Sequence, residues 1–165
     1  MNVNEIYDFA KEIFPINRSI TGSGVRETLG IIQRELPDLI IHTIPTGKKC
    51  FDWYIPKEWN VIDAYILAPD GEKICDFKNN NLHLMGYSVP IELTLDLEEL
   101  DKHLHSLPDQ PDAIPYITSY YKDEWGFCIT DSQRKKLKDG AYSVVIDSSL
   151  KDGELNYGEL LIKGD

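Results

Sequence analysis

The feature that most constrains this chain is a change in the spacing of its apolar residues near Leu39. Before that point apolar residues recur every three or four positions, as in amphipathic helices. They are Ile6, Phe9, Ile13, Phe14, Val25, Leu29, Ile32 and Leu36. From Leu39 onwards apolar and polar residues alternate, which is typical of half-buried strands. The order predicts an α+β fold, with two N-terminal helices followed by a β-rich domain.

Local signals set the bounds that we expect for each element. The first helix should end before Pro15, and the second should run from Ser23, as its N-cap, to Pro37. We expect strands over 39–45, 51–55, 60–68, 73–77, 117–121, 142–146 and 155–163. Two small helices should be inserted among them: one over 97–107, on a leucine stripe, and one after the capping box that begins at Thr130.

The composition limits the classes of partner. The 165 residues carry a formal net charge of −11, which disfavours nucleic acid and anionic membranes as partners. The short basic run from Arg134 to Lys138 is interpreted as the last turn of a helix. No signal peptide and no apolar stretch of membrane-spanning length is present. The three cysteines form no C-x-x-C pair, so free thiols and a cytoplasmic location are expected.

Motifs for a complete catalytic site are absent from the sequence. There is no H-E-x-x-H, no G-x-S-x-G and no Walker loop. His103 and His105 are the only closely spaced histidines, and on the expected helix they would point to different faces. We therefore predict no metal site and no catalytic residue in this chain.

The segment between the two expected helices is the first candidate site. Arg18, Ser19 and Thr21 precede a helix start, and Arg26 lies one turn into that helix. Arginine and helix N-termini both bind anions, so these residues could hold a substrate carboxylate or another anion. The alternative is a capped turn between helices, whose arginine pairs with a local acid.

The tryptophans form the second candidate. The three tryptophans, Trp53, Trp59 and Trp125, lie close in sequence to acidic residues. This combination of residue types is common in sugar-binding surfaces. Tryptophans of a β-rich domain are more often core or interface residues. The aromatic surface supports an alternative function for the chain, as a non-catalytic glycan- or protein-binding module.

Five motifs together carry a family resemblance. They are R-S-I-T-G-S-G-V-R-E-T-L (18–29), F-D-W-Y-I-P-K-E-W-N-V-I-D-A-Y-I (51–66), G-Y-S-V-P (86–90), S-Y-Y-K-D-E-W-G-F-C (119–128) and D-G-E-L-N-Y-G-E (152–159). The chain resembles the aminopeptidase-like proteins of bacterial polysaccharide-biosynthesis clusters over nearly its whole length. That family joins a zinc-exopeptidase-like domain to an inserted β-rich domain of unknown function.

The resemblance implies a division of the chain. Residues 1–38 would be the helical start of the peptidase-like domain, 39–148 the inserted domain, and 149–165 the first part of the peptidase-like sheet. The family's zinc ligands would follow that strand, and none of the four histidines matches one. The apolar end from Leu160 to Ile162 also reads as a cut within a longer protein.

The resemblance also implies a cofactor and partners. Zinc is expected in a complete parent protein and not on this chain, which alone should be inactive. Its partner would be the remainder of the peptidase-like domain, and Arg18 to Gly22 would face the active-site cleft. Exposed apolar surface would favour a homo-oligomer.

Overall fold

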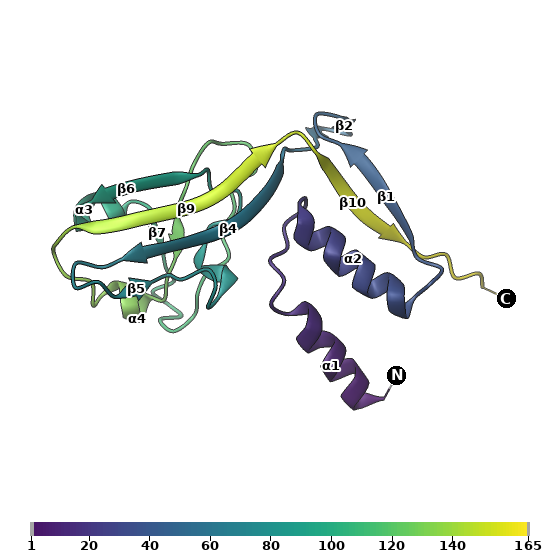
Figure 1. The fold of residues 1–165 in the computed structure, drawn as a ribbon, viewed down its shortest axis with the longest axis horizontal. Coiled ribbons are helices and arrows are strands. Elements are labelled where there is room, and N and C mark those ends of the chain that lie inside the picture. The colour runs from purple at the N-terminus through teal and green to yellow at the C-terminus, as the bar shows by residue number, and fades with distance from the viewer. Residues whose placement is uncertain (1, 165) are drawn as a thin grey trace. The chain divides into compact units, whose positions relative to one another are not determined.

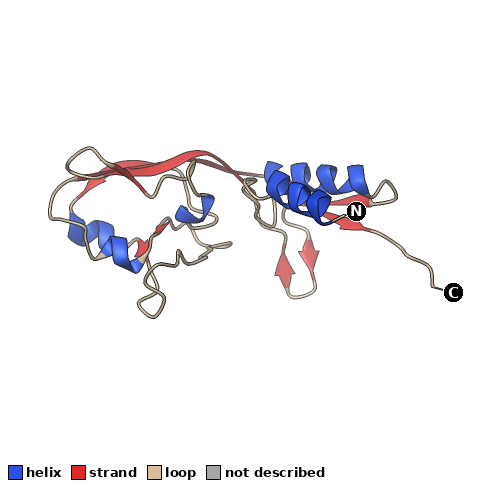
Figure 2. Ribbon diagram, turned by 90° about the horizontal axis from the view of Figure 1, so that it is seen from below, coloured by secondary structure: helices blue, strands red, loops and turns tan. Residues whose placement is uncertain are grey.

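The computed structural model describes residues 2–164. It contains four α-helices and ten strands in small sheets, which confirms the predicted α+β class (Figures 1 and 2). The chain forms two compact units. Unit 1 comprises residues 1–60 and 151–165, and unit 2 comprises residues 61–150. Both boundaries fall inside long strands, β4 (Glu58–Leu67) and β9 (Tyr142–Lys151).

Unit 1 has two helices and a two-stranded sheet. The helices are α1 (Val3–Ile13) and α2 (Ser23–Glu35), and the sheet pairs β1 (Ile40–Pro45) antiparallel to β10 (Glu154–Glu159). Helix α2 lies along this sheet (Figure 1). A short hairpin joins β2 (Lys49–Cys50) to β3 (Trp53–Tyr54). The sheet therefore joins segments from the two ends of the chain.

Local sequence explains how each helix of unit 1 begins. Asn2 and Glu5 form a reciprocal capping box at the start of α1. The predicted N-cap of α2, Ser23, is wrong, because Gly22 occupies that position with φ of 105° and Ser23 is the first helical residue. A Cβ on Gly22 would lie 2.4 Å from the carbonyl oxygen of Trp59, so only glycine fits there.

Unit 2 is built on a four-stranded sheet in the order β5-β4-β9-β6, where β5 is Lys73–Ile74 and β6 is Ile91–Leu95. The residues of β4 and β9 that lie in its core are Ala64, Ile66, Tyr142, Val144 and Ile146. Smaller elements complete the unit: η1 (Asn81–His83), α3 (Leu97–Asp101), β7 (Leu104–His105), β8 (Phe127–Cys128) and α4 (Asp131–Arg134). Strands β7 and β8 pair in parallel.

Five predicted elements are shorter in the structure. The strands over 51–55 and 73–77 are reduced to the two-residue strands β3 and β5. The helix over 97–107 is wrong beyond Asp101, because Leu104 and His105 form β7 and pair with β8. The strand over 117–121 is reduced to a single bridge between Thr118 and Gly86. The strand over 155–163 ends at Glu159. Over 97–107, leucines at this spacing suit either one face of a helix or the buried side of a strand. The pairing of β7 with β8 decides between the two.

The two units differ in how much apolar surface they bury. Among the described residues, fourteen of the seventeen buried hydrophobic side chains belong to unit 2. Unit 1 contributes Leu39, Ile55 and Trp59. None of the eleven residues of α1 is buried. Unit 2 thus contains a core of its own, whereas unit 1 has a small one.

Candidate functional site

The segment between α1 and α2 is anchored by its own side chains. Arg18 is exposed, and its guanidinium donates to the carbonyl of Ile13 at the end of α1. The Ser19 hydroxyl donates to the carbonyl of Thr21 at 2.5 Å. Thr21 is buried, at 1 % exposure, and its hydroxyl oxygen accepts the N–H of Trp59 at 3.2 Å. These bonds attach the segment to the beginning of β4.

Arg26 belongs to a polar network between α2 and the strands beside it. Its guanidinium donates to both carboxylate oxygens of Glu58, at 2.9 and 2.6 Å. Asn60 donates to the same carboxylate at 2.9 Å, and the amide N–H of Glu154 donates to it at 3.4 Å. The side-chain oxygen of Asn156, a buried residue, accepts a longer bond of 3.4 Å from Arg26. Glu58 is the centre of this network.

The electrostatics of the network follow from its hydrogen bonds. The hydrogen bonds from Arg26 and, to a smaller extent, the bond from Asn60 lower the pKa of Glu58 to about 2, although partial burial acts in the opposite direction. The Glu58 carboxylate in turn raises the pKa of Arg26. Both groups are charged across the physiological range. A bidentate pair of this kind is rigid and orients α2 against β4.

The four residues predicted to bind an anion are therefore not gathered around one free position. Arg26 is directed to Glu58, Thr21 to the backbone of β4, and Ser19 to its own turn. The backbone N–H of Ser23, at the start of α2, donates to the side chain of Asn60 at 2.7 Å. Arg18 remains exposed at the surface. Anion binding by this segment stays a prediction, with Arg18 as its most accessible cation.

The three tryptophans lie in different environments. Trp59, in unit 1, is buried at 4 % exposure, while Trp53 in β3 is half-buried. Trp125, in unit 2, is half-buried and stacks on His103 with ring centroids 3.7 Å apart. Sugar binding by these residues stays a prediction. The buried Trp59 is the least suited of the three to contact a ligand.

The His, Cys, Asp and Glu side chains of residues 2–164 are poorly arranged for metal binding, and two of the thiols are poorly suited to nucleophilic chemistry. Within residues 2–164 no group of three or more His, Cys, Asp or Glu side chains could hold a metal ion. His103 instead stacks on Trp125, and a ring nitrogen of His83 lies 2.8 Å from the carbonyl of Cys128. Burial raises the pKa of the Cys75 thiol to about 12 and that of Cys128 to about 11. Both thiols are thus protonated at neutral pH and are poor nucleophiles.

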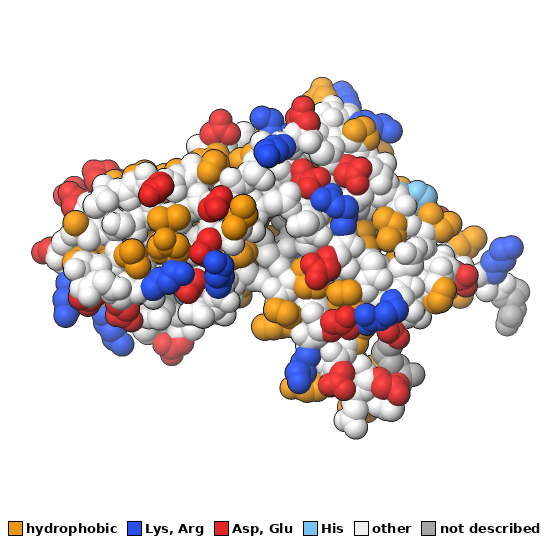
Figure 3. Space-filling model, in the orientation of Figure 1, with side chains coloured by type: hydrophobic (Ala, Val, Ile, Leu, Met, Phe, Trp, Pro, Cys, Tyr) orange, Lys and Arg blue, Asp and Glu red, His pale blue; other side chains and the backbone are white. Residues whose placement is uncertain are grey.

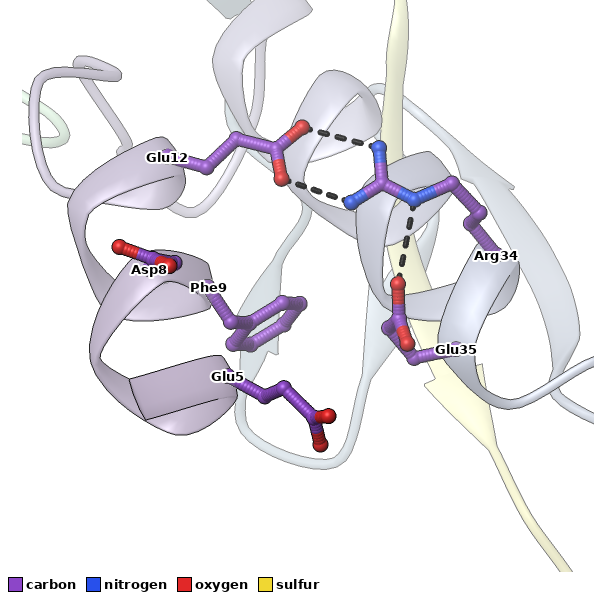
Figure 4. Close-up of a pocket in the computed structure, with 6 residues that line it drawn as sticks. All are labelled: Glu5, Asp8, Phe9, Glu12, Arg34 and Glu35. Carbon is purple, nitrogen blue, oxygen red and sulfur yellow. Dashed lines mark hydrogen bonds and ion pairs between the residues drawn. The ribbon is translucent and has the colours of Figure 1, made fainter. Parts of the chain in front are cut away.

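A pocket between α1 and α2 was not predicted from the sequence. It has a volume of about 310 Å³ and is lined by Glu5, Asp8, Phe9, Glu12, Arg34 and Glu35 (Figure 4). Arg34 donates to both carboxylate oxygens of Glu12, at 2.9 and 2.6 Å, and to Glu35 at 3.2 Å. Glu5 is engaged in the capping box of α1. The polar groups of the pocket thus mainly connect the two helices.

Sequence reasoning also missed Glu58, Asn60 and Asn156. Glu58 and Asn60 lie 32 and 37 positions from their partners in α2, and Asn156 lies 130 positions from Arg26. No local period connects such residues. Their only signal was that each lies within one of the motifs that carry the family resemblance.

None of the helices within residues 2–164 is long and apolar enough to cross a membrane. This finding concerns the helices that the structure describes. It agrees with the absence of a long apolar stretch in the sequence.

Comparison with known proteins bears out the resemblance. The chain is 55% identical over 161 residues to a Clostridium acetobutylicum protein described as "Putative polysaccharide biosynthesis protein with aminopeptidase-like domain". That match covers 98% of this chain and 37% of the relative. A crystal structure of a "putative peptidase" from Clostridium acetobutylicum matches with a TM-score of 0.89 and 55% identity, over 94% of this chain and 36% of that one. This chain thus spans little more than a third of the length of either relative.

The family assignment rests on the greater part of the chain. Residues 58–149 match the family described as "Domain of unknown function (DUF2172)". The matched segment contains the whole of unit 2 apart from its last residue, Leu150, together with the first three residues of β4. The chain belongs to the DUF2172 family.

Proposed function

We propose that this chain forms a non-catalytic part of a zinc-dependent aminopeptidase-like protein of polysaccharide biosynthesis. One observation carries the proposal: 98% of the chain aligns, at 55% identity, with 37% of a relative that has an aminopeptidase-like domain. Unit 1 would belong to the peptidase-like domain. Unit 2, the DUF2172 domain, would be an insertion that shapes substrate access or assembly, and the insertion would then begin at residue 61 instead of residue 39.

The side chains of this chain do not fit a zinc site, since residues 2–164 bring no three ligand side chains together. Zinc would be held by ligands on the part of the longer protein that this chain does not match. We assign no step of peptide hydrolysis to residues of this chain. The proposed contribution of unit 1 is structural, through the Arg26–Glu58 network that holds α2 to β4.

The proposal includes one substrate contact. Arg18 is exposed beside the Ser19 turn, and a guanidinium binds carboxylates well. We propose that Arg18 would hold a substrate carboxylate at the edge of the cleft in the longer protein. A cytoplasmic location, consistent with the three free cysteines, is part of the same proposal.

Peptidase assays on two proteins test this function. The first is the purified 165-residue chain, and the second is a hybrid in which this chain replaces the matched segment of the Clostridium relative. With aminoacyl-nitroanilide substrates and added zinc, we expect no turnover by the chain alone and turnover by the hybrid that a chelator abolishes. Chelator-sensitive turnover by the chain alone would refute the proposal.

The alternative function is a glycan- or protein-binding module. The half-buried Trp53 and Trp125 are the observations in its favour, because partly exposed aromatic rings can stack on sugars. Calorimetric titration of the chain with oligosaccharides separates the two proposals. Saturable binding that Trp125→Ala removes, without a change in the folded state, would favour the binding module.

A further inference from the structure

Unit 1 leaves much of its apolar surface exposed. Three of its hydrophobic side chains are buried, whereas eleven large ones are exposed among the described residues. The exposed set comprises Val3, Ile6, Tyr7, Phe14, Leu36, Ile40, Phe51, Tyr54, Tyr157, Leu161 and Ile162. In Figure 3, hydrophobic side chains lie open to solvent over the region of β1 and β10. Large exposed apolar patches usually mark surfaces that another polypeptide covers.

The β1–β10 sheet has one face turned to α2. A Cβ built on Gly158 would lie 3.2 Å from a methyl carbon of Leu29, so this position faces the helix. Asn156 contacts Arg26 of α2 on the same face. Thr43, the register partner of Asn156, bonds to its side chain at 3.2 Å. One set of alternate residues of the two strands therefore faces α2.

The remaining residues of the two strands form the opposite face, here called the open face. Because side chains alternate along a strand, the open face comprises Ile40, His42, Ile44, Leu155, Tyr157 and Glu159. Ile40 is 59% exposed and Tyr157 is 44% exposed. His42 stacks on Tyr157 with ring centroids 4.9 Å apart and lies 2.9 Å from Glu159. Four of the six side chains are apolar or aromatic.

This pattern is typical of a sheet that is covered on both faces. Strands that carry apolar residues on both sides, as β1 does with Ile40, Ile41 and Ile44, occur in three-layer folds. Of the six residues on the open face, Ile40, Tyr157 and Glu159 are exposed, whereas His42, Ile44 and Leu155 are half-buried. Burial of the exposed Ile40 and Tyr157 would need a second layer from another polypeptide segment.

We propose that the open face is covered by the part of the aminopeptidase-like protein that this chain does not match. This inference rests on the proposed function and adds the surface through which the two parts join. A second copy of this chain suits the face less well. Each copy carries a formal charge of −11, and the open face itself offers Glu159 and no lysine or arginine to offset that repulsion.

Thermal unfolding of two matched variants tests the inference. Ile40→Lys places a charge on the open face, and Ile62→Lys places the same charge on β4 at a position that is 72% exposed. In the 165-residue chain both changes should shift Tm by less than about 2 °C, because both positions are exposed. In the hybrid with the Clostridium relative, Ile40→Lys should lower Tm by about 5 °C or more, and Ile62→Lys should again have little effect.

Hydrogen exchange provides a second measurement that needs no variant. Amides of β1 and β10 should exchange at least about tenfold more slowly in the hybrid than in the chain alone, because the covered sheet opens less often. Equal exchange in both proteins, or an equal small effect of Ile40→Lys in both, would overturn the inference. A dimer of the chain alone that Ile40→Lys converts to a monomer would also overturn it, in favour of a second copy.

The peptidase assay separates this inference from the proposed function. An active hybrid that tolerates Ile40→Lys would leave the function standing and refute the covered face. An inactive hybrid that Ile40→Lys nevertheless destabilises would support the covered face and count against the function.

Discussion

At the scale of single residues, Gly22 is a position where backbone geometry leaves no choice of side chain. Its φ of 105° is a conformation that L-residues rarely adopt, and the carbonyl oxygen of Trp59 lies only 2.4 Å from where a Cβ would be. The glycine therefore permits both the start of α2 and its close approach to β4. Gly30, in the same helix, has open space at its Cβ position.

Opposite effects are expected from the same substitution at these two glycines. Gly22→Ala should lower the free energy of unfolding by about 2–4 kcal/mol, because it adds a steric clash to backbone strain. Gly30→Ala should raise it by about 0.5–1 kcal/mol, because alanine is the better helix former. Urea denaturation of both variants and the parent measures these changes. If Gly22→Ala were as stable as the parent, the close packing of the turn on β4 would be wrong.

At the scale of elements, the Arg26–Glu58 pair decides how α2 is held against β4. The pair lies partly out of water, with the Glu58 side chain 14% exposed. Its bidentate geometry is the kind that contributes more than an ordinary surface ion pair. The pair between Glu12 and Arg34, which connects α1 to α2, is more exposed and should contribute little.

The lowered pKa of Glu58 predicts a specific pH dependence of stability. A carboxyl group with a depressed pKa stabilises the folded state fully above its unfolded value, here 4.5, and loses that contribution as the pH falls through about 2. Glu58→Gln should therefore lower stability by about 2 kcal/mol at pH 7 and have almost no effect near pH 2.

Melting curves of the parent and the Glu58→Gln variant between pH 7 and pH 2 measure this difference. Glu27→Gln, which changes an exposed carboxylate of the same helix, serves as the control and should resemble the parent at pH 7. A constant difference between the parent and Glu58→Gln across the whole range would contradict the proposed ionisation of Glu58.

At the scale of the whole molecule, the two units differ in their hydrophobic cores. Unit 2 has a core of its own, whereas unit 1 has only a small one. Within residues 2–164, fourteen of the seventeen buried hydrophobic side chains belong to unit 2. Hydrophobic burial is the main source of folding free energy. Unit 2 should therefore be able to fold alone, whereas unit 1 depends on its connection to other polypeptide.

Excision of unit 2 tests this view. A fragment of residues 58–151, which keeps β4 and β9 whole, should unfold in one cooperative thermal transition. Phe127→Ala within it should lower the free energy of unfolding by about 3–5 kcal/mol, because Phe127 is fully buried. A broad transition together with strong binding of a hydrophobic dye would show that unit 2 lacks an independent core.

The sequence predicted elements well where one period dominates a segment. The apolar stripes of α1 and α2 and the alternation along β4 each follow the period of one local structure, although only the stripe of β4 is deeply buried. The pattern was ambiguous over 97–107, where leucines at helical spacing also suit the buried side of a short strand. Pairing of Leu104 with Phe127, twenty-three positions away, decided that case.

The sequence by itself determined the α+β class, the order of the long elements and the membership of a family. Those properties depend on local periodicity and on motifs that can be read directly along the chain. The tertiary structure alone decided that Arg26 meets Glu58, that β1 pairs with β10, and that β1 and β10 carry an apolar face that α2 does not cover. The physical reason is that these contacts join segments far apart in sequence, so no local pattern encodes which groups will meet.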